Sequence, residues 1–241
     1  MDGGAEPARH FFADLHCHTS FSFDSLSRPA AVARVAAQRG LTHLAITDHE
    51  RIDGALAARD AAVAGLTVII GQEVRTTSGD LIGLFLERAV APGTSSLDAA
   101  RAIREQGGLV GLPHPFDRWR ASGGRRHDAA DWAALLELVD YVEGYNARLM
   151  LGDGNERALE LARQHGLPTV AVSDAHTLME VGVAYTSFAA APSSANALRA
   201  TLDSARLHPG RGARLLRAGM PLVKGINWLR GNRRLAVPAE R

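Results

Sequence analysis

Two histidines near the start of the chain, in the run Asp14-Leu-His-Cys-His-Thr, are spaced to bind a metal ion. If the preceding residues form a β-strand, side chains at positions i and i+2 point to the same face, so His16 and His18 share one side and Cys17 faces the other. Imidazole is a common ligand of divalent transition metals. A pair of structural histidines with the same spacing is the alternative, and residues elsewhere in the chain distinguish the two.

The elements that must position these side chains follow a regular rhythm. Short β-rich runs alternate with longer alanine-rich stretches, which predicts successive β-α units and a mostly parallel sheet. We expect strands at 11–18, 41–47, 66–74, 80–86, 109–112, 141–145, 169–173 and 184–188, and helices at 30–39, 53–64, 95–106, 128–138, 153–165 and 193–205. The strand at 80–86 follows a Thr-Thr-Ser-Gly turn that is too short for a helical crossover, so it should run antiparallel to its predecessor.

Further histidines and carboxylates follow the C-terminal ends of the predicted strands. In β/α barrels this rim is where active sites are built. The set comprises Asp24, Asp48, His49, Glu73, His114, Asp174 and His176. Five other histidines occupy a terminus, a strand interior, a loop, a helix end and the C-terminal region, and we expect them to be structural: His10, His43, His127, His165 and His208.

The residue types at this rim indicate the metal and the reaction. Imidazoles and carboxylates without thiolates suit Zn, Mn or Fe. The candidate ligands are too many for one ion, which points to two or three divalent ions. Two ions about 3.5–4 Å apart can generate a hydroxide nucleophile and stabilise both the attacking and the leaving oxygens of phosphoryl transfer. The pattern therefore predicts a hydrolytic centre.

The composition is that of an ordinary folded domain, with 46% apolar and 22% charged residues in a chain of 241, long enough to bury a core. The single cysteine, Cys17, excludes an internal disulfide and thiolate-rich zinc sites. No run of about 18 uninterrupted apolar residues predicts a membrane span, and the first ten residues lack the apolar core of a signal peptide. We therefore expect a cytoplasmic protein without a transmembrane segment.

Charge divides the chain into an acidic body and a basic tail. Residues 207–241 hold eight Arg or Lys and one Glu, a net charge of +7, so residues 1–206 carry about −6. We expect a flexible N-terminus at 1–10, a barrel domain at 11–206, and a basic C-terminal tail at 207–241 that is docked or partly disordered. The apolar residues of the tail could dock it on the barrel, on a partner or on a membrane surface.

The strand-end motifs resemble, in order and spacing, those of the polymerase and histidinol phosphatase (PHP) family. The resemblance spans roughly residues 11–190 and rests on His16-Cys-His18, Asp24, Thr47-Asp48-His49, Glu73, Pro113-His114-Pro115 and Asp174-Ala-His176. It implies an α/β fold, a distorted seven-stranded β/α (TIM-like) barrel, with a di- or trinuclear metal site at the C-terminal rim. It also implies hydrolysis of phosphomonoesters or phosphodiesters. Some family members are domains of bacterial polymerases, and some have lost their ligands and activity.

Carried over residue by residue, the resemblance implies eight metal ligands. One ion would be held by His16, His18, Glu73 and Asp174, a second by Glu73 as a bridge and partly by His114, and a third position would be completed by Asp24, His49 and His176. Asp48 is expected behind the ligands or at a helix cap. Asp80 stands where many trinuclear members have a histidine, so the two-ion site is better supported than a full cluster.

Phosphate recognition requires cations beside the metal site, and the planar guanidinium of arginine offers two donors to one phosphate. Arg118, close after His114, and Arg148, close after a strand end, are the best placed. Asn146 shares that rim and is the third candidate for substrate binding.

We therefore expect a metal-dependent phosphoesterase in which a hydroxide bridging two ions attacks phosphorus in line and an arginine neutralises the developing charge. Asp24, His49 or His176 would act as the general acid near the leaving group. The substrate would be a phosphorylated small molecule or a nucleotide. A nuclease or nucleic-acid-associated module that uses the basic tail is the main alternative and should bind with steep salt dependence. A regulatory metal-binding domain and a metal-free barrel enzyme are two others, and the oligomeric state stays open.

Overall fold

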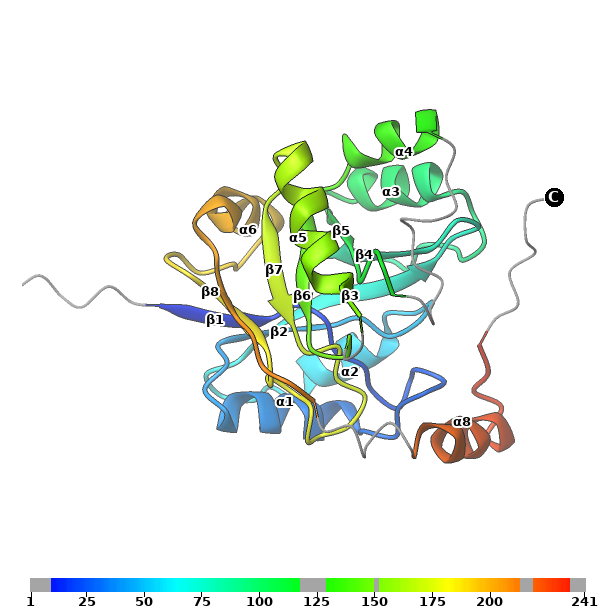
Figure 1. Ribbon diagram of the computed structural model, residues 1–241. Helices are drawn as coiled ribbons and strands as arrows, with labels where there is room; N and C mark the ends of the chain where they lie inside the picture. The colour runs from blue at the N-terminus through cyan, green and yellow to red at the C-terminus, as the bar shows by residue number, and fades with distance from the viewer. Residues whose placement is uncertain (1–9, 118–128, 150–151, 213–218, 235–241) are drawn as a thin grey trace, which may run out of the picture.

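The computed structural model describes residues 10–117, 129–149, 152–212 and 219–234. A single sheet curls into a nearly closed barrel, and helices pack on its outer side (Figure 1). The nine strands are β1 (Phe11–Asp14), β2 (His43–Ile46), β3 (Thr67–Arg75), β4 (Asp80–Leu84), β5 (Leu109–Leu112), β6 (Tyr141–Asn146), β7 (Thr169–Val172), β8 (Tyr185–Phe188) and β9 (Arg206–His208), in the order β7-β6-β5-β4-β3-β2-β1-β8-β9. The distorted β/α barrel is confirmed, and its sheet in the described residues has one strand more than the eight predicted from the sequence pattern and two more than the seven that the resemblance implies.

Strand direction brings most strand ends to one rim. The pairs β1–β2, β2–β3, β5–β6 and β6–β7 are parallel. Strand β4 runs antiparallel to both β3 and β5, as its short connecting turn predicts. The first residue of β4, Asp80, pairs with Arg75 at the end of β3, so it faces the same rim as the C-terminal ends of the parallel strands.

The barrel closes between its first strand and its late strands. Beyond β1, Cys17 bridges to Ala175 in parallel register, and the His18 amide donates to the Ala175 carbonyl at 2.8 Å. In β8, the Thr186 hydroxyl accepts from the Ala171 amide at 2.8 Å and donates to the Ala171 carbonyl at 3.0 Å. Side-chain and irregular backbone contacts thus replace a regular ladder at this seam, which distorts the barrel.

Apolar side chains fill the barrel interior, as in other β/α barrels. The interior cluster includes Leu15, Ile69, Leu109, Tyr141 and Val172, each at most 2% exposed. Two further apolar clusters lie between the sheet and the helices. The interior is therefore a packed core, and a ligand reaches the polar rim from outside.

The helices are α1 (Pro29–Gln38), α2 (Asp53–Asp60), α3 (Ser96–Glu105), α4 (Ala129–Leu136), α5 (Gly154–His165), α6 (Ala195–Thr201) with the 3-10 turn η2 (Leu202–Ser204), and α8 (Met220–Leu229). Helix α2 ends four residues before the expected position, and Ala62 beyond it has a left-handed backbone (φ 46°). Helix α8 was not expected as a helix, and it lies beside the loop that follows β1 (Figure 1). Within the described residues, no helix combines the length and apolarity needed to cross a membrane.

Candidate metal centre

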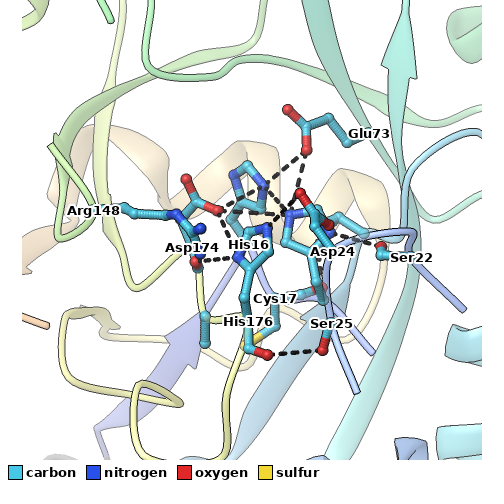
Figure 2. A network of polar contacts seen from close by, with 12 residues as sticks. His16, Cys17, Ser22, Asp24, Ser25, Glu73, Arg148, Asp174 and His176 are labelled. Atoms are coloured by element: carbon cyan, nitrogen blue, oxygen red, sulfur yellow. Dashed lines mark hydrogen bonds and ion pairs between the residues drawn. The ribbon is translucent and has the colours of Figure 1, made fainter. Parts of the chain in front are cut away.

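All eight predicted metal ligands lie together at the C-terminal rim, and each is at most 9% exposed. Figure 2 shows His16, Asp24, Glu73, Asp174 and His176 turned toward a common centre. They come from the ends of β1, β3 and β7 and from the loop after β1. The fold thus brings together side chains that are up to 160 positions apart in the sequence.

An inner group of ligands lies deepest in the rim. His16, His18 and Asp174 each offer a donor atom, and these atoms lie within 4.8 Å of one another. Asp174 Oδ1 is 3.7 Å from His16 Nε2 and 3.6 Å from His18 Nε2. Glu73 Oε2 approaches the same two nitrogens at 3.4 and 3.3 Å. This arrangement can hold one divalent ion.

An outer group lies nearer the solvent and shares His18 with the inner group. His18, Asp24, His49 and His176 offer donor atoms within 4.8 Å of one another. Asp24 Oδ2 is 3.6 Å from His49 Nε2 and 3.3 Å from His176 Nε2. The set can hold a second ion close to the first.

Glu73 connects the two groups. Its Oε2 atom lies 3.3 Å from His49 Nδ1, and its Oε1 atom lies 3.2 Å from His114 Nε2. One carboxylate therefore faces four imidazoles, with no hydrogen bond to the buried Oε2 atom among the described residues. Burial would raise the pKa of Glu73, but the nearby His49 and the contact with His114 outweigh it and hold that pKa well below its usual value.

The hydrogen-bond network fixes the proton positions of His16 and His18. His16 Nδ1 lies 2.6 Å from Glu143 Oε1, and a carboxylate accepts, so Nδ1 carries the proton. His18 Nδ1 lies 3.0 Å from Ser22 Oγ, whose own proton goes to Asp48 at 2.7 Å, so this Nδ1 also carries its proton. The two Nε2 atoms face each other at 3.0 Å, the length of a hydrogen bond when one of them carries a proton. When neither Nε2 carries a proton, both lone pairs are available to one metal ion, and the donor set fits such an ion.

The buried carboxylates of the centre favour positive charge on the neighbouring imidazoles. Burial would lower the pKa of His16, but the carboxylates of Glu143 and Asp174 outweigh it and raise that pKa well above the ordinary value. His49 behaves alike, because Glu73 and Asp24 overcome burial and raise its pKa to about 9. Without a metal, protons supply the charge that the buried carboxylates require.

His176 differs from these two imidazoles. Burial and the nearby Arg148 lower its pKa to about 3. Its Nδ1 lies 2.9 Å from the Asp174 carbonyl oxygen, which can only accept, so Nε2 presents a lone pair toward Asp24. The imidazole is neutral and suited to metal ligation.

Two ligands at the ends of strands have strained backbones. His114 and Asp174 lie in the left-handed region, with φ of 28° and 52°. Residues other than glycine seldom adopt this region, and such strain concentrates at functional sites. The backbone bends at the points where the chain must turn a ligand into the rim.

Glu143, a residue that the sequence reasoning missed, supports the inner group from behind. It is fully buried in β6, and its second oxygen accepts from the His114 amide at 3.0 Å and from Asn146 Nδ2 at 2.8 Å. A carboxylate that orients a ligating imidazole raises the basicity of that ligand. The signal in the sequence is one acidic residue inside the otherwise uncharged strand Tyr-Val-Glu-Gly-Tyr-Asn.

Asp48 organises the loop that follows β1, in keeping with its expected place behind the ligands. Its carboxylate accepts from the Thr19 amide and hydroxyl, both at 2.6 Å, and from the Ser22 hydroxyl. Gly54 at the start of α2 leaves room for it, because a methyl group there would overlap Asp48 Oδ2 and Thr19 Oγ1. The contact holds the loop that carries Asp24.

The three predicted substrate-binding residues have different surroundings. Arg148 lines the cavity at the rim, and its buried Nη1 atom has no hydrogen-bond partner among the described residues. Asn146 is fully buried, and its amide nitrogen donates to Glu143 and, at 3.1 Å, to Asp174 Oδ2, so it orients a ligand rather than facing the cavity. Arg118 lies outside the described residues, as does most of the loop at 117–127.

A cavity of about 310 Å³ opens over the outer group. Its walls include Asp24, His49 and His176, the three candidates for the general acid, whereas the inner ligands lie beneath them. Asp80 also lines this cavity and is buried, and neither of its carboxylate oxygens accepts a hydrogen bond from the residues that the structure describes. Burial and the neighbouring Glu73 raise the pKa of Asp80. Its described ion-pair partner is Arg234 from the C-terminal tail, at 3.7 Å.

Comparisons with known proteins identify the family. The PHP domain matches residues 14–146, and a PHP-associated domain matches residues 152–207. An uncharacterized protein of Methanocaldococcus jannaschii is 33% identical over 175 residues, which cover 73% of this chain and 69% of that protein. A 5'-3' exoribonuclease of Haemophilus influenzae is 29% identical over 171 residues, or 65% of this chain and 62% of the relative.

Solved structures show the same fold at low sequence identity. A two-domain protein of Bacteroides vulgatus that contains a predicted PHP-like metal-dependent phosphoesterase has a TM-score of 0.67 at 20% identity, over 84% of this chain and 65% of that one. A lesion-specific endonuclease of Pyrococcus furiosus has a TM-score of 0.64 at 15% identity, over 97% of this chain and 74% of that one. With its barrel and its cluster of His and Asp side chains able to bind metal, the chain belongs to the PHP domain family.

Proposed function

We propose that the protein is a metal-dependent phosphoesterase with two or three divalent ions, Mn, Zn or Fe, at the rim. The observation that carries the proposal is the pair of adjoining ligand groups that share His18 and are connected by Glu73. Bound ions would activate water for attack on phosphorus and neutralise charge on the phosphoryl oxygens.

The protein's own groups have separate tasks in this proposal. Glu143 and Ser22 fix the tautomers of His16 and His18, so their Nε2 lone pairs face the ions. Arg148 lines the cavity, its Nη1 atom has no hydrogen-bond partner among the described residues, and its guanidinium would bind a phosphoryl oxygen. Of the three candidates for the general acid that line the cavity, His49 is the one whose raised pKa lets it hold a proton for the leaving group, whereas His176 is neutral and the nearby His176 and His49 hold the pKa of Asp24 low.

A hydrolysis screen tests the proposal directly. Protein supplied with Mn, Zn or Fe is assayed against phosphomonoesters, cyclic and linear phosphodiesters and short oligonucleotides. We expect turnover that requires metal and is lost in Asp174→Ala, and retained in His165→Ala, an exposed histidine at the end of α5. Metal-independent turnover, or full turnover by a folded Asp174→Ala protein of measured metal content, would contradict it.

Nuclease activity is the second candidate, and the exoribonuclease relative and the endonuclease fold neighbour favour it. The basic C-terminal residues Lys224 and Arg234 at the cavity could contact a nucleic-acid backbone. A nuclease of this kind should lose affinity steeply with salt, because phosphate contacts release counterions. Oligonucleotide hydrolysis measured from low to high salt separates the two candidates.

A further inference from the structure

The C-terminal segment 219–234 forms one wall of the cavity at the metal centre. Met220, Lys224 and Arg234 line the cavity together with Asp24, His49 and His176. Figure 1 shows α8 beside the loop that follows β1, the loop that carries Asp24. A segment more than 200 residues from His16 thus lies at the same site.

Two asparagines of the segment 219–234 form hydrogen bonds with the loop that follows β1. Asn227 is 2% exposed, and its Nδ2 atom lies within hydrogen-bond distance of the carbonyls of Ser22, Phe23 and Ser25, at 3.3, 3.0 and 2.9 Å. Asn232 Nδ2 likewise faces the carbonyls of 20–22, at 3.1–3.3 Å. Buried amide donors matched to carbonyls fix the register of the segment, because a shift by one residue would leave those groups unpaired.

The segment turns two cations toward the cavity. Lys224 Nζ and Arg234 Cζ each lie 5.4 Å from the centre of the Phe23 ring. Asp80, buried at the start of β4, holds the Arg234 guanidinium at 3.7 Å. Lys224 has no carboxylate partner in the part of the chain that the structure describes. Together with Arg148, three cations border the cavity, whose lining also includes the carboxylates of Asp24, Asp80 and Asp117.

Charge and size indicate the substrate that such a cavity accepts. A phosphomonoester carries up to two negative charges near neutral pH, since its second pKa is about 6, whereas a diester carries one. With Asp24 among the metal ligands and Asp80 paired with Arg234, Arg148 and Lys224 outnumber the remaining carboxylate of Asp117, and this positive balance favours the monoester. A volume of about 310 Å³ is near the lower end for ligand pockets, roughly 300–1,000 Å³, and suits a small molecule better than a continuous strand.

Resting on the phosphoesterase function proposed above, we infer that Lys224 and Arg234 are specificity-determining residues that bind the phosphate of a small phosphomonoester. The C-terminal segment is thereby part of the substrate site, and Asn227 and Asn232 are the residues that position it.

Kinetics on two aryl esters test this inference. p-Nitrophenyl phosphate serves as the monoester and bis-p-nitrophenyl phosphate as the diester, in the full chain loaded with Mn. We expect Lys224→Met and Arg234→Met each to lower kcat/KM for the monoester roughly tenfold, the effect of one lost charge-assisted contact, mainly through KM. The diester should be affected less, so the preference for the monoester shrinks. Inorganic phosphate should inhibit both variants more weakly than the wild type.

Arg230→Met is the matched control, because Arg230 is an exposed cation at the end of α8 that does not line the cavity. It should keep wild-type kinetics. Asn227→Asp, which sets a carboxylate against three carbonyls, should reproduce the kinetics of the Lys224→Met/Arg234→Met double variant although both cations remain. Metal content and thermal unfolding are measured for every variant, so that loss of the fold is recognised.

The outcomes separate the two proposals. If the wild type hydrolyses neither aryl ester nor any other substrate of the screen with any of the metals, the phosphoesterase function fails. If the wild type is active but Lys224→Met and Arg234→Met match Arg230→Met in KM, ester preference and phosphate inhibition, the inference fails while the function stands.

Discussion

His16 Nε2 and His18 Nε2 face each other at 3.0 Å, each with its proton held on the opposite side of the ring by Glu143 or Ser22. The pair can share a proton on one Nε2 atom, in keeping with the raised pKa of His16, or can offer both lone pairs to a metal ion. Both side chains are buried and held in place whichever cation they bind. A metal ion that replaces the proton should therefore stabilise the folded protein.

Removal of the metal should destabilise the fold. A ligand that binds the folded state alone stabilises it by about 2.7 kcal/mol at a concentration a hundred times its dissociation constant. We expect the Tm to fall on dialysis against a chelator and to recover with Mn or Zn. Differential scanning calorimetry measures the shift, and an Asp174→Ala variant serves as control. An equal Tm with and without metal would show that no ion binds at this centre.

Glu143→Gln should weaken metal binding while every ligand remains. The amide keeps the shape of the side chain but no longer supports the His16 imidazole as a carboxylate does, and changes of this kind typically cost about 10–100-fold in affinity. Competition with a metal indicator dye measures the loss. Glu137→Gln, outside the rim, is the control. Unchanged affinity in Glu143→Gln would mean that the carboxylate has no part in orienting the ligand.

Gly54→Ala should disturb both stability and the centre. The added methyl group would overlap Asp48 Oδ2, which cannot retreat without breaking its bond to Thr19. Overpacking of this kind costs about 1–3 kcal/mol, and displacement of the loop should lower turnover. Urea unfolding is the measurement. Gly225→Ala in α8 is the matched control, since nothing lies within 4 Å of the new methyl. If Gly54→Ala kept the stability and turnover of the wild type, the assigned role of Asp48 would be overturned.

The buried carboxyl group of Asp14 should make the free energy of unfolding depend on pH. Burial raises its pKa to about 6, although bonds from Ser173 and Gly182 oppose the shift. Because the folded protein holds this proton more tightly than the unfolded chain, stability falls as pH rises from about 4 to 6, by on the order of 3 kcal/mol. Unfolding in urea with a chelator present should show that Asp14→Asn lacks this component. If the free energy of unfolding changed with pH in the same way in the wild type and in Asp14→Asn, the assignment to Asp14 would be refuted.

Much of the fold and the site follows from local signals in the sequence. The β-α rhythm places strands β1 to β8 within a few residues but does not indicate β9, and strand ends place His49, Glu73, His114 and Asp174 at one rim. The Thr-Thr-Ser-Gly turn predicts the antiparallel β4 because chain length alone decides that connection. Local geometry is sufficient wherever the relevant contact lies within one β-α unit.

Contacts between distant segments escape this reasoning. Glu143 lies 127 positions from the imidazole that it orients, and its strand carries no repeated pattern to reveal the partner. Helix α8 has Pro221 near its start and exposed Leu222 and Leu229, so its amphipathic pattern indicates no packing partner. Its attachment depends on Asn227, a polar residue whose three carbonyl partners exist only once the loop after β1 has folded.

The position of Lys224 and Arg234 separates the metal ligands from part of the cavity wall along the chain. All eight predicted ligands lie between His16 and His176, whereas the segment 219–234 lines the cavity without contributing one of them. Substitutions in that segment can therefore change the charge of the cavity while every ligand stays the same.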